Sequence, residues 1–279
     1  MSDIGLARRE FLYERRAFTR DPQAVFFAVG LPLLYVVIFV SLFGNQTLDF
    51  VYDGQPGPLK AKMVMLAGFM AIGIVSAAFY NLSVALVQDR ESGVLKRFRG
   101  TPLPTWAFIA GHVGTAVMTG GLVAVALLVL GRLAYSIPVP IAGLPALALA
   151  LVVASAAFCC LGFAFTLVVR KAGAITPLGT GVTLALYFLS GNFFLVENPP
   201  LVLRLVGTFF PVKHLNRALL TPLNPNAHGL RIEGLDLAVL ALWGVGGLLV
   251  ALRFFRWTPS SEMSHRGADA EGARGAVPE

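Results

Sequence analysis

Long apolar stretches with few or no charged residues alternate with short polar segments along most of this chain. Each stretch is close to the roughly 20 residues that a helix needs to cross a bilayer. They lie at 22–44, 63–87, 105–130, 143–169, 172–192 and 235–254. We therefore predict an all-α integral membrane protein with six transmembrane helices. Residues 1–257 would form a single transmembrane domain, and the polar tail 258–279 is expected to be disordered.

A charged interruption, QDRESGVLKRFRGTPL, separates the second and third stretches at Gln88–Leu103. Irregular backbone cannot face lipid, so this segment must lie in water or against another protein. Its apolar and basic positions fall on opposite helical faces, namely Val94, Leu95 and Phe98 against Lys96, Arg97 and Arg99. We expect a short amphipathic helix that docks onto a partner.

The N-terminal residues 5–20 predict a second amphipathic helix, which lies along the membrane surface before the chain turns inward at Asp21-Pro22. Its candidate contact residues are Arg8, Arg9, Glu10, Phe11, Arg15 and Arg16. The alternative is a charged anchor that only sets topology. Because the stretch mixes both charges ahead of the first span, we do not expect a cleavable leader.

Two insertions are expected on the outer side. Residues Asn45–Lys62 are polar with turn signals and predict an ordinary loop. Phe193–Gly234 contains apolar runs cut by prolines, which favours two short helices on or partly within the outer leaflet. A long disordered loop is the alternative.

Composition and charge narrow the class. Hydrophobic residues make up 56% of the 279 residues and charged residues only 13%, which argues against a soluble globule. With the N-terminus inside, fifteen of the 22 Lys and Arg residues are cytoplasmic, so both termini are expected in the cytoplasm. The net charge of +7 needs no nucleic-acid partner, because topology and attraction to anionic membrane lipid account for it.

The spans hold almost no interior charged residues, which disfavours an ion-coupled secondary transporter. His112 lies within a span, where a polar residue satisfied inside the bundle is a simpler interpretation than a proton relay. No convergent set of His, Asp or Glu favours a membrane-embedded enzyme, and Cys159-Cys160 favour packing over a metal site. The sequence also lacks a GxxxxGK[ST] phosphate loop, so ATP would have to be split elsewhere.

Arg90-Glu91-Ser92-Gly93, followed by Leu95 and Thr101-Pro102, is similar to the cytoplasmic signature of the type-2 ABC exporter permeases. FLSGNFFLVENPP at Phe188–Pro200, with Pro211 and Arg217 after it, resembles that family's end of span five and its extracellular re-entrant helices. The two motifs occur in the family's order on a six-span plan, and the resemblance covers essentially the whole chain.

The resemblance implies a non-catalytic half-transporter of the bacterial inner membrane, similar to drug- and antibiotic-efflux permeases. Two copies, or this chain and a related permease, would bind two copies of a separate ABC ATPase subunit that holds ATP and Mg²⁺, while this chain holds no cofactor and no metal. Coupling to the ATPase would fall to Arg90, Glu91, Ser92, Gly93, Leu95, Lys96, Arg97, Phe98, Arg99 and Pro102. The re-entrant region would include Glu197, Pro199, Pro200, Pro211 and Arg217.

Polar and aromatic residues within the spans are candidates for the substrate path, although such residues also serve helix packing. They are Tyr80, Asn81, Ser83, Thr115, Thr119, Tyr187, Ser190, Asn192, Phe193 and Phe194. The expected cargo is a hydrophobic or amphipathic compound such as a drug, an antibiotic or a lipid-linked molecule. Export of a polysaccharide or lipid-linked glycan is the alternative, disfavoured because only three Trp residues are present for sugar stacking.

Overall fold

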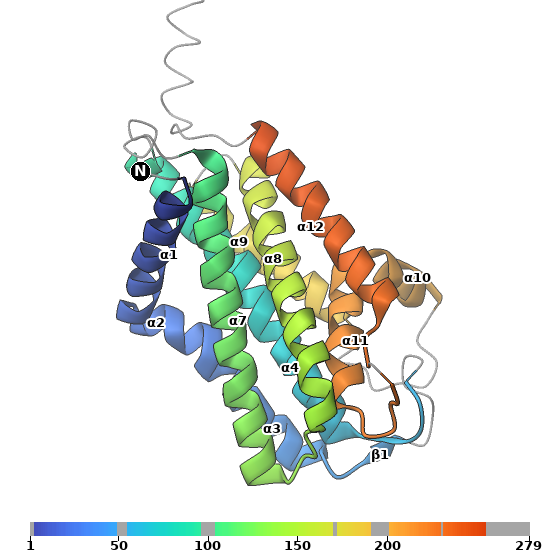
Figure 1. The fold of residues 1–279 in the computed structure, drawn as a ribbon. Helices are drawn as coiled ribbons and strands as arrows, with labels where there is room; N and C mark the ends of the chain where they lie inside the picture. The colour runs from blue at the N-terminus through green and yellow to red at the C-terminus, as the bar shows by residue number, and fades with distance from the viewer. Residues whose placement is uncertain are drawn as a thin grey trace, which may run out of the picture.

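The computed structural model describes residues 3–48, 55–95, 104–169, 172–190, 201–229 and 231–254. Over these ranges the chain forms a bundle of long helices, with the N-terminal helix against one side (Figure 1). The structure confirms the prediction of an all-α membrane protein, to which it adds one very short hairpin.

The helices follow the chain in a simple order. They are α1 (Asp3–Arg20), α2 (Pro22–Val25), the π-helical turn η1 (Phe26–Gly30), α3 (Leu31–Phe43), α4 (Ala61–Val75), the π-helical turn η3 (Ser76–Asn81), α5 (Leu82–Glu91), α7 (Thr105–Tyr135), the 3₁₀ turn η4 (Ile141–Gly143), α8 (Leu144–Val168), α9 (Ala172–Leu189), α10 (Leu201–Phe209), α11 (Pro211–Leu223) and α12 (Gly234–Phe254).

Five of the described helical segments are long and apolar enough to cross a membrane. They are Phe26–Phe43, Ala61–Glu91, Thr105–Tyr135, Ile141–Val168 and Gly234–Phe254. The remaining predicted span, 172–192, corresponds to the shorter apolar helix α9. Each of the six predicted stretches is therefore helical except at its ends, over the residues that the structure describes.

Two of these helices extend beyond the apolar stretch that predicted them. The second runs without a break through α4, η3 and α5 to Glu91, a turn past the predicted end at residue 87. The third reaches Tyr135, past Arg132, and ends where Ser136 adopts a left-handed conformation with φ 49°. Hydropathy marks where a helix becomes polar, whereas the helix itself ends where backbone hydrogen bonding ends.

Asn45–Lys62, which the sequence predicted as an ordinary loop, contains a short hairpin. Strands β1 (Thr47–Leu48) and β2 (Leu59–Lys60) pair antiparallel, with Thr47 opposite Lys60 and Leu48 opposite Leu59. The side chain of Leu59 is buried against the helices. We call this part of the bundle the hairpin end, and the part where α5 ends and α7 begins the α1 end.

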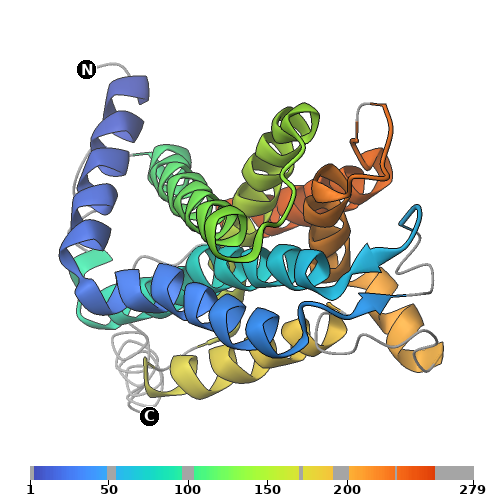
Figure 2. The ribbon, with the colours of Figure 1, turned by 90° about the horizontal axis from the view of Figure 1, so that it is seen from below.

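The two short helices expected between the last two spans are present as α10 and α11. Nearly all of α11 is buried, because it packs against α4, α8 and α12 in the half of the bundle nearer the hairpin end. In the view from below, α9 lies on the side of α3 and α4 opposite α7 and α8 (Figure 2).

Small residues bring α12 and α8 into close contact. A Cβ atom added at Gly244 would lie 2.9 Å from the Cα of Ala157, and one added at Gly247 would lie 2.9 Å from the carbonyl carbon of Cys160. Lipid provides no hydrophobic force between membrane helices, so this pair depends on van der Waals packing over small residues. Both cysteines are free and buried in this contact region.

Replacing Gly247 by valine should therefore separate α12 from α8. We expect Gly247→Val to lower the free energy of unfolding in detergent by about 1–3 kcal/mol, the usual cost of overpacking. Gly246→Val is the matched control, because nothing lies within 4 Å of a Cβ atom at Gly246. Equal thermal unfolding midpoints for the two variants would contradict this account of the packing.

Candidate functional site

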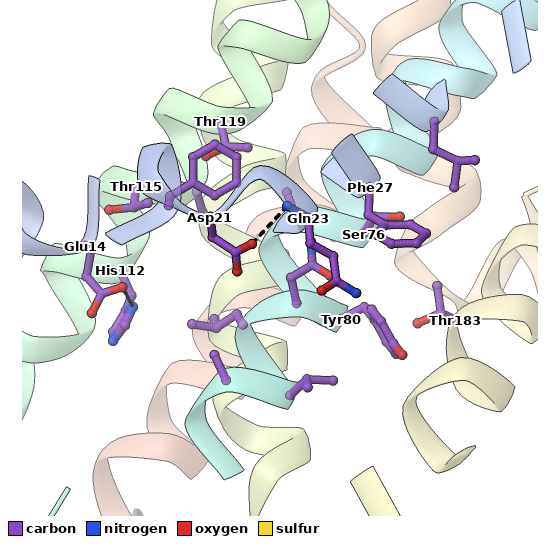
Figure 3. A pocket seen from close by; sticks show the side chains of 18 of the residues that line it. Glu14, Asp21, Gln23, Phe27, Ser76, Tyr80, His112, Thr115, Thr119 and Thr183 are labelled. Carbon is purple, nitrogen blue, oxygen red and sulfur yellow. Dashed lines mark hydrogen bonds and ion pairs between the residues drawn. The ribbon is translucent and has the colours of Figure 1, made fainter. Parts of the chain in front are cut away.

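A cavity of about 780 Å³ lies where α1 and α2 pass the long helices of the bundle. Its walls come from α1, α2, η1, α3, η3, α5, α7 and α9. Figure 3 shows Thr115 and Thr119 on one side, Tyr80 and Thr183 on the other, and Asp21 and Gln23 between them. Pockets for small organic ligands have volumes of about 300–1,000 Å³, so this cavity is large enough for one.

Both π-helical turns contribute to the cavity wall. Phe27 comes from η1, and Ser76, Tyr80 and Asn81 come from η3. The amide of Leu31 bonds the carbonyl of Phe26, five residues back, in place of the usual four. Single π turns inside α-helices occur frequently at functional sites. Here they place rings and polar groups on the cavity wall without breaking either helix.

Hydrogen bonds fix the two tyrosines of the wall. The hydroxyl of Tyr187 lies 2.6 Å from Ser76 Oγ and donates to the Ile72 carbonyl at 3.1 Å. Thr180 Oγ1 lies 3.3 Å from the hydroxyl of Tyr80. These contacts join α9 to η3, the π turn of the second span. The rings of Tyr80 and Tyr187 are therefore held in place by two helices.

Two carboxylates, those of Glu14 and Asp21, line the cavity. Glu14 Oε2 is 3.5 Å from His112 Nδ1, which links α1 to α7. Asp21 Oδ1 accepts a hydrogen bond of 2.9 Å from the backbone N–H of Gln23 and so caps α2. The ring of His112 packs edge-on against Phe108 and Phe163. His112 therefore belongs to both the bundle core and the cavity wall.

The structure brings together five of the predicted substrate-path residues, which line the cavity: Tyr80, Asn81, Thr115, Thr119 and Tyr187. Ser83 and Ser190 are not part of the cavity wall. Ser83 is buried, with its hydroxyl donating to the carbonyls of Phe79 and Gly162, and Ser190 donates to the carbonyl of Tyr187. Asn192, Phe193 and Phe194 lie outside the described residues.

Sequence reasoning missed the wall residues contributed by α1, α2 and the middle of α9, such as Glu14, Gln23 and Thr183. No local motif marks them, since their role depends on α1 lying against α7. A partial signal existed in Asp21-Pro22, which marked the turn that brings α1 to the bundle.

Arg90, predicted to couple the chain to a partner, is 6% exposed and contacts the end of α8. Its guanidinium donates to the carbonyls of Thr166 at 3.0 Å and Val169 at 2.6 Å, and to Glu91 Oε1 at 3.2 Å. The last carbonyls of a helix lack intrahelical partners, so Arg90 caps α8 with charge-assisted bonds. The second span is thereby tied to the fourth at the α1 end.

Residues after Arg90 end the helix. Gly93 has φ +77°, a conformation that glycine adopts without strain, and its amide bonds the carbonyl of Arg90. Ser92 is exposed and Leu95 is buried in the core. Lys96, Arg97, Phe98, Arg99 and Pro102 lie outside the described residues.

The helix predicted at residues 5–20 is present as α1, with one face against the bundle, and its position at a membrane surface stays a prediction. Phe11 packs onto Gly114 of α7, where an added Cβ atom would lie 2.9 Å from the ring. The basic residues Arg8, Arg9, Arg15 and Arg16 are exposed, and the side chain of Glu10 lies outside those described.

In the re-entrant region, Pro211 begins α11 and Arg217 lies near its middle. Arg217 Nε lies 3.3 Å from Asp236 Oδ2, and the other oxygen of Asp236 is 2.6 Å from His214 Nδ1. These contacts of the buried Asp236 join α11 to the start of α12, and the pairing of His214 with Asp236 was not foreseen. Glu197, Pro199 and Pro200 lie outside the described residues.

Within the described ranges, no group of three or more His, Cys, Asp or Glu side chains could hold a metal ion. The cavity wall is suited to binding by shape, hydrogen bonds and charge.

Comparison with known proteins identifies a family. The family model described as "ABC-2 type transporter" matches residues 5–223, from α1 to the end of α11. No curated protein matches the chain.

Removal of the Arg90 guanidinium should loosen the end of α8. We expect Arg90→Met, which keeps most of the apolar stem, to cost about 3 kcal/mol because two carbonyls lose charge-assisted bonds. Amide exchange at residues 166–169 should rise in parallel. Glu91→Gln serves as the control, since it leaves both carbonyl bonds intact. If Arg90→Met were no less stable than the control, Arg90 would not cap α8.

Proposed function

This chain belongs to the ABC-2 type transporter family, and from that premise we propose that it exports a hydrophobic or amphipathic compound through the cavity beside α1. It is a multi-pass membrane protein and the permease component of an ABC transporter. Such components are generally non-catalytic and work with an ATPase in a separate subunit. The direction of transport and the class of cargo are our proposals.

The observation that carries the proposal is the cavity itself. Its residues come from α1, the two π turns, α7 and α9, so any relative movement of these elements would change its shape. A cavity between helices that move as rigid bodies can pass between open and closed forms without chemistry of its own.

The size and lining of the cavity favour a small amphipathic molecule over a glycan. About 780 Å³ accommodates a compound of drug size. Its wall includes Leu31, Val84 and Leu184 together with the rings of Phe18 and Phe27. A growing polysaccharide would need an extended channel with many hydrogen-bonding groups.

Energy would enter at the α1 end. The partner ATPase, which binds ATP and Mg²⁺, would contact the segment that follows Arg90 and the exposed basic face of α1. A movement of the second span would be passed to α8 through Arg90, because Arg90 joins that span to the last carbonyls of α8. From α8 the movement reaches α12 through the Gly244 and Gly247 contacts.

We further propose that two permease chains, identical or related, assemble with two ATPase subunits in a bacterial inner membrane, with both termini in the cytoplasm. The excess of Lys and Arg in the segments at the α1 end supports this orientation.

Reconstitution with the partner ATPase in liposomes tests the function. We expect uptake of an amphipathic fluorophore into inverted vesicles when ATP is supplied, unchanged by ionophores that collapse ion gradients. An ATPase subunit that cannot hydrolyse ATP should abolish uptake. Uptake driven by an ion gradient without nucleotide would overturn the proposal.

A bulky residue in the cavity should block transport. Thr180 lines the cavity, so Thr180→Trp should reduce ATP-driven transport about tenfold or more while the complex still assembles. Val182→Trp is the matched control, since Val182 is an exposed β-branched residue of α9 that is not part of the wall. Similar transport by both variants would show that the cargo takes another route.

A further inference from the structure

Four residues of the cavity wall carry buried polar atoms that have no hydrogen-bond partner among the described residues. The atoms are Asn81 Nδ2, His112 Nε2, Thr119 Oγ1 and Thr183 Oγ1. They come from three parts of the bundle, namely η3, α7 and α9. Buried polar groups in folded proteins are nearly always paired, so unpaired ones from several helices around one space point to a ligand.

Helix packing does not explain these atoms. Polar side chains inside membrane helices usually bond to a neighbouring helix, as the hydroxyl of Ser83 does with the carbonyl of Gly162. Thr119 and Thr183 are only 2% and 7% exposed, yet their hydroxyls make no such bond within the described ranges. An unpaired buried polar group destabilises the fold, and polar residues that are retained inside membrane helices are typically functional.

The unpaired atoms offer both a donor and an acceptor. The amide nitrogen of Asn81 only donates, whereas a threonine hydroxyl donates and accepts. Nδ1 of His112 lies 3.5 Å from a carboxylate oxygen of Glu14, so in the neutral ring the proton lies on Nδ1 and Nε2 accepts. Two exposed carboxamides, those of Gln23 and Gln88, add the same chemistry to the wall. The wall is therefore complementary to a group that both accepts and donates without carrying charge.

These polar groups surround the space from different sides. Figure 3 shows Thr119 and Thr183 on opposite sides of the cavity. Rotation about one side-chain bond redirects a threonine hydroxyl, and the relative movement of helices that the proposed function requires uncovers the other atoms. Apolar side chains such as Phe27 and Leu184 also line the cavity. A cargo can thus bond through its polar group while its apolar body contacts these side chains.

Building on the proposed function, we propose that the cavity selects amphipathic compounds that carry an uncharged secondary amide. The amide carbonyl accepts from Asn81 Nδ2, and the amide N–H donates to a threonine hydroxyl or to His112 Nε2. Compounds of the same shape without the amide bind more weakly, because the buried polar atoms then stay unpaired.

Isosteric substitutions separate ligand binding from a structural role. Asn81→Leu, Thr119→Val and Thr183→Val keep the shape of each side chain and remove its unpaired atom. Removal of an unpaired polar atom does not destabilise a fold, so the triple variant should unfold at the wild-type midpoint or above it. Thr166→Val is the matched control, because the Thr166 hydroxyl donates to the Phe163 carbonyl at 2.7 Å and Thr166 does not line the cavity. Its midpoint should fall.

Two uncharged probes test the selection of amides. Both carry one fluorophore and one alkyl chain, joined by a secondary amide in the first and by a saturated hydrocarbon link of equal length in the second. Binding is measured by fluorescence anisotropy on the detergent-solubilised complex, and the ratio between wild type and variant cancels the partition of each probe into micelles. We expect the triple variant to bind the amide probe about tenfold more weakly than the wild type and the hydrocarbon probe equally well. Thr166→Val should bind both probes as the wild type does.

The outcomes distinguish this inference from the exporter function. Unchanged amide binding in the triple variant, or an equal loss for both probes, would overturn the selection of amides. A lower unfolding midpoint of the triple variant would show that its polar atoms have partners in the folded protein, and would overturn the selection as well. Transport in liposomes with ATP is measured separately. Amide-selective binding without ATP-driven transport of either probe would refute export and leave the amide site standing.

Discussion

The absence of water in the bilayer is the constraint on which the whole structure depends, because every backbone polar group must then find its partner inside the protein. Long helices meet this condition along their length. The backbone groups at helix ends and at irregular turns lack such partners and must find them elsewhere. The end of α8 is the clearest instance. Its last carbonyls receive the guanidinium of Arg90 from another span, so satisfying a helix end also fastens two helices together.

The same constraint explains the form of the cavity. A helix that broke to admit polar side chains would leave backbone groups facing lipid. The π turns η1 and η3 avoid such a break, since the helix runs on through each of them while the register of the side chains shifts. Phe27, Tyr80 and Asn81 thereby reach one space from two spans. At the other end of the bundle, the buried Asp236 is compensated by His214 and Arg217, which fix α11 against α12.

The α1 end and the hairpin end of the bundle are held together by different contacts. At the hairpin end, Gln55, Thr221 and Asn224 are joined by buried hydrogen bonds that hold the hairpin to α11. At the α1 end, α1 rests on α7 through Phe11 and Glu14, and the cavity opens beside it.

Hydropathy alone predicted the class of the protein, helices over the six apolar stretches, the N-terminal helix α1 and the two short helices of the last insertion, because burial in lipid requires long uncharged stretches. It also singled out Tyr80, Thr115 and Tyr187 as polar residues within spans. Only the tertiary structure decided that these residues share a cavity with Glu14 and Asp21, that Ser83 serves packing, and that Arg90 caps α8. Such roles depend on which helix faces which, and this follows from close packing at residues such as Gly114, Gly244 and Gly247, whose partners in space cannot be derived from their spacing along the chain.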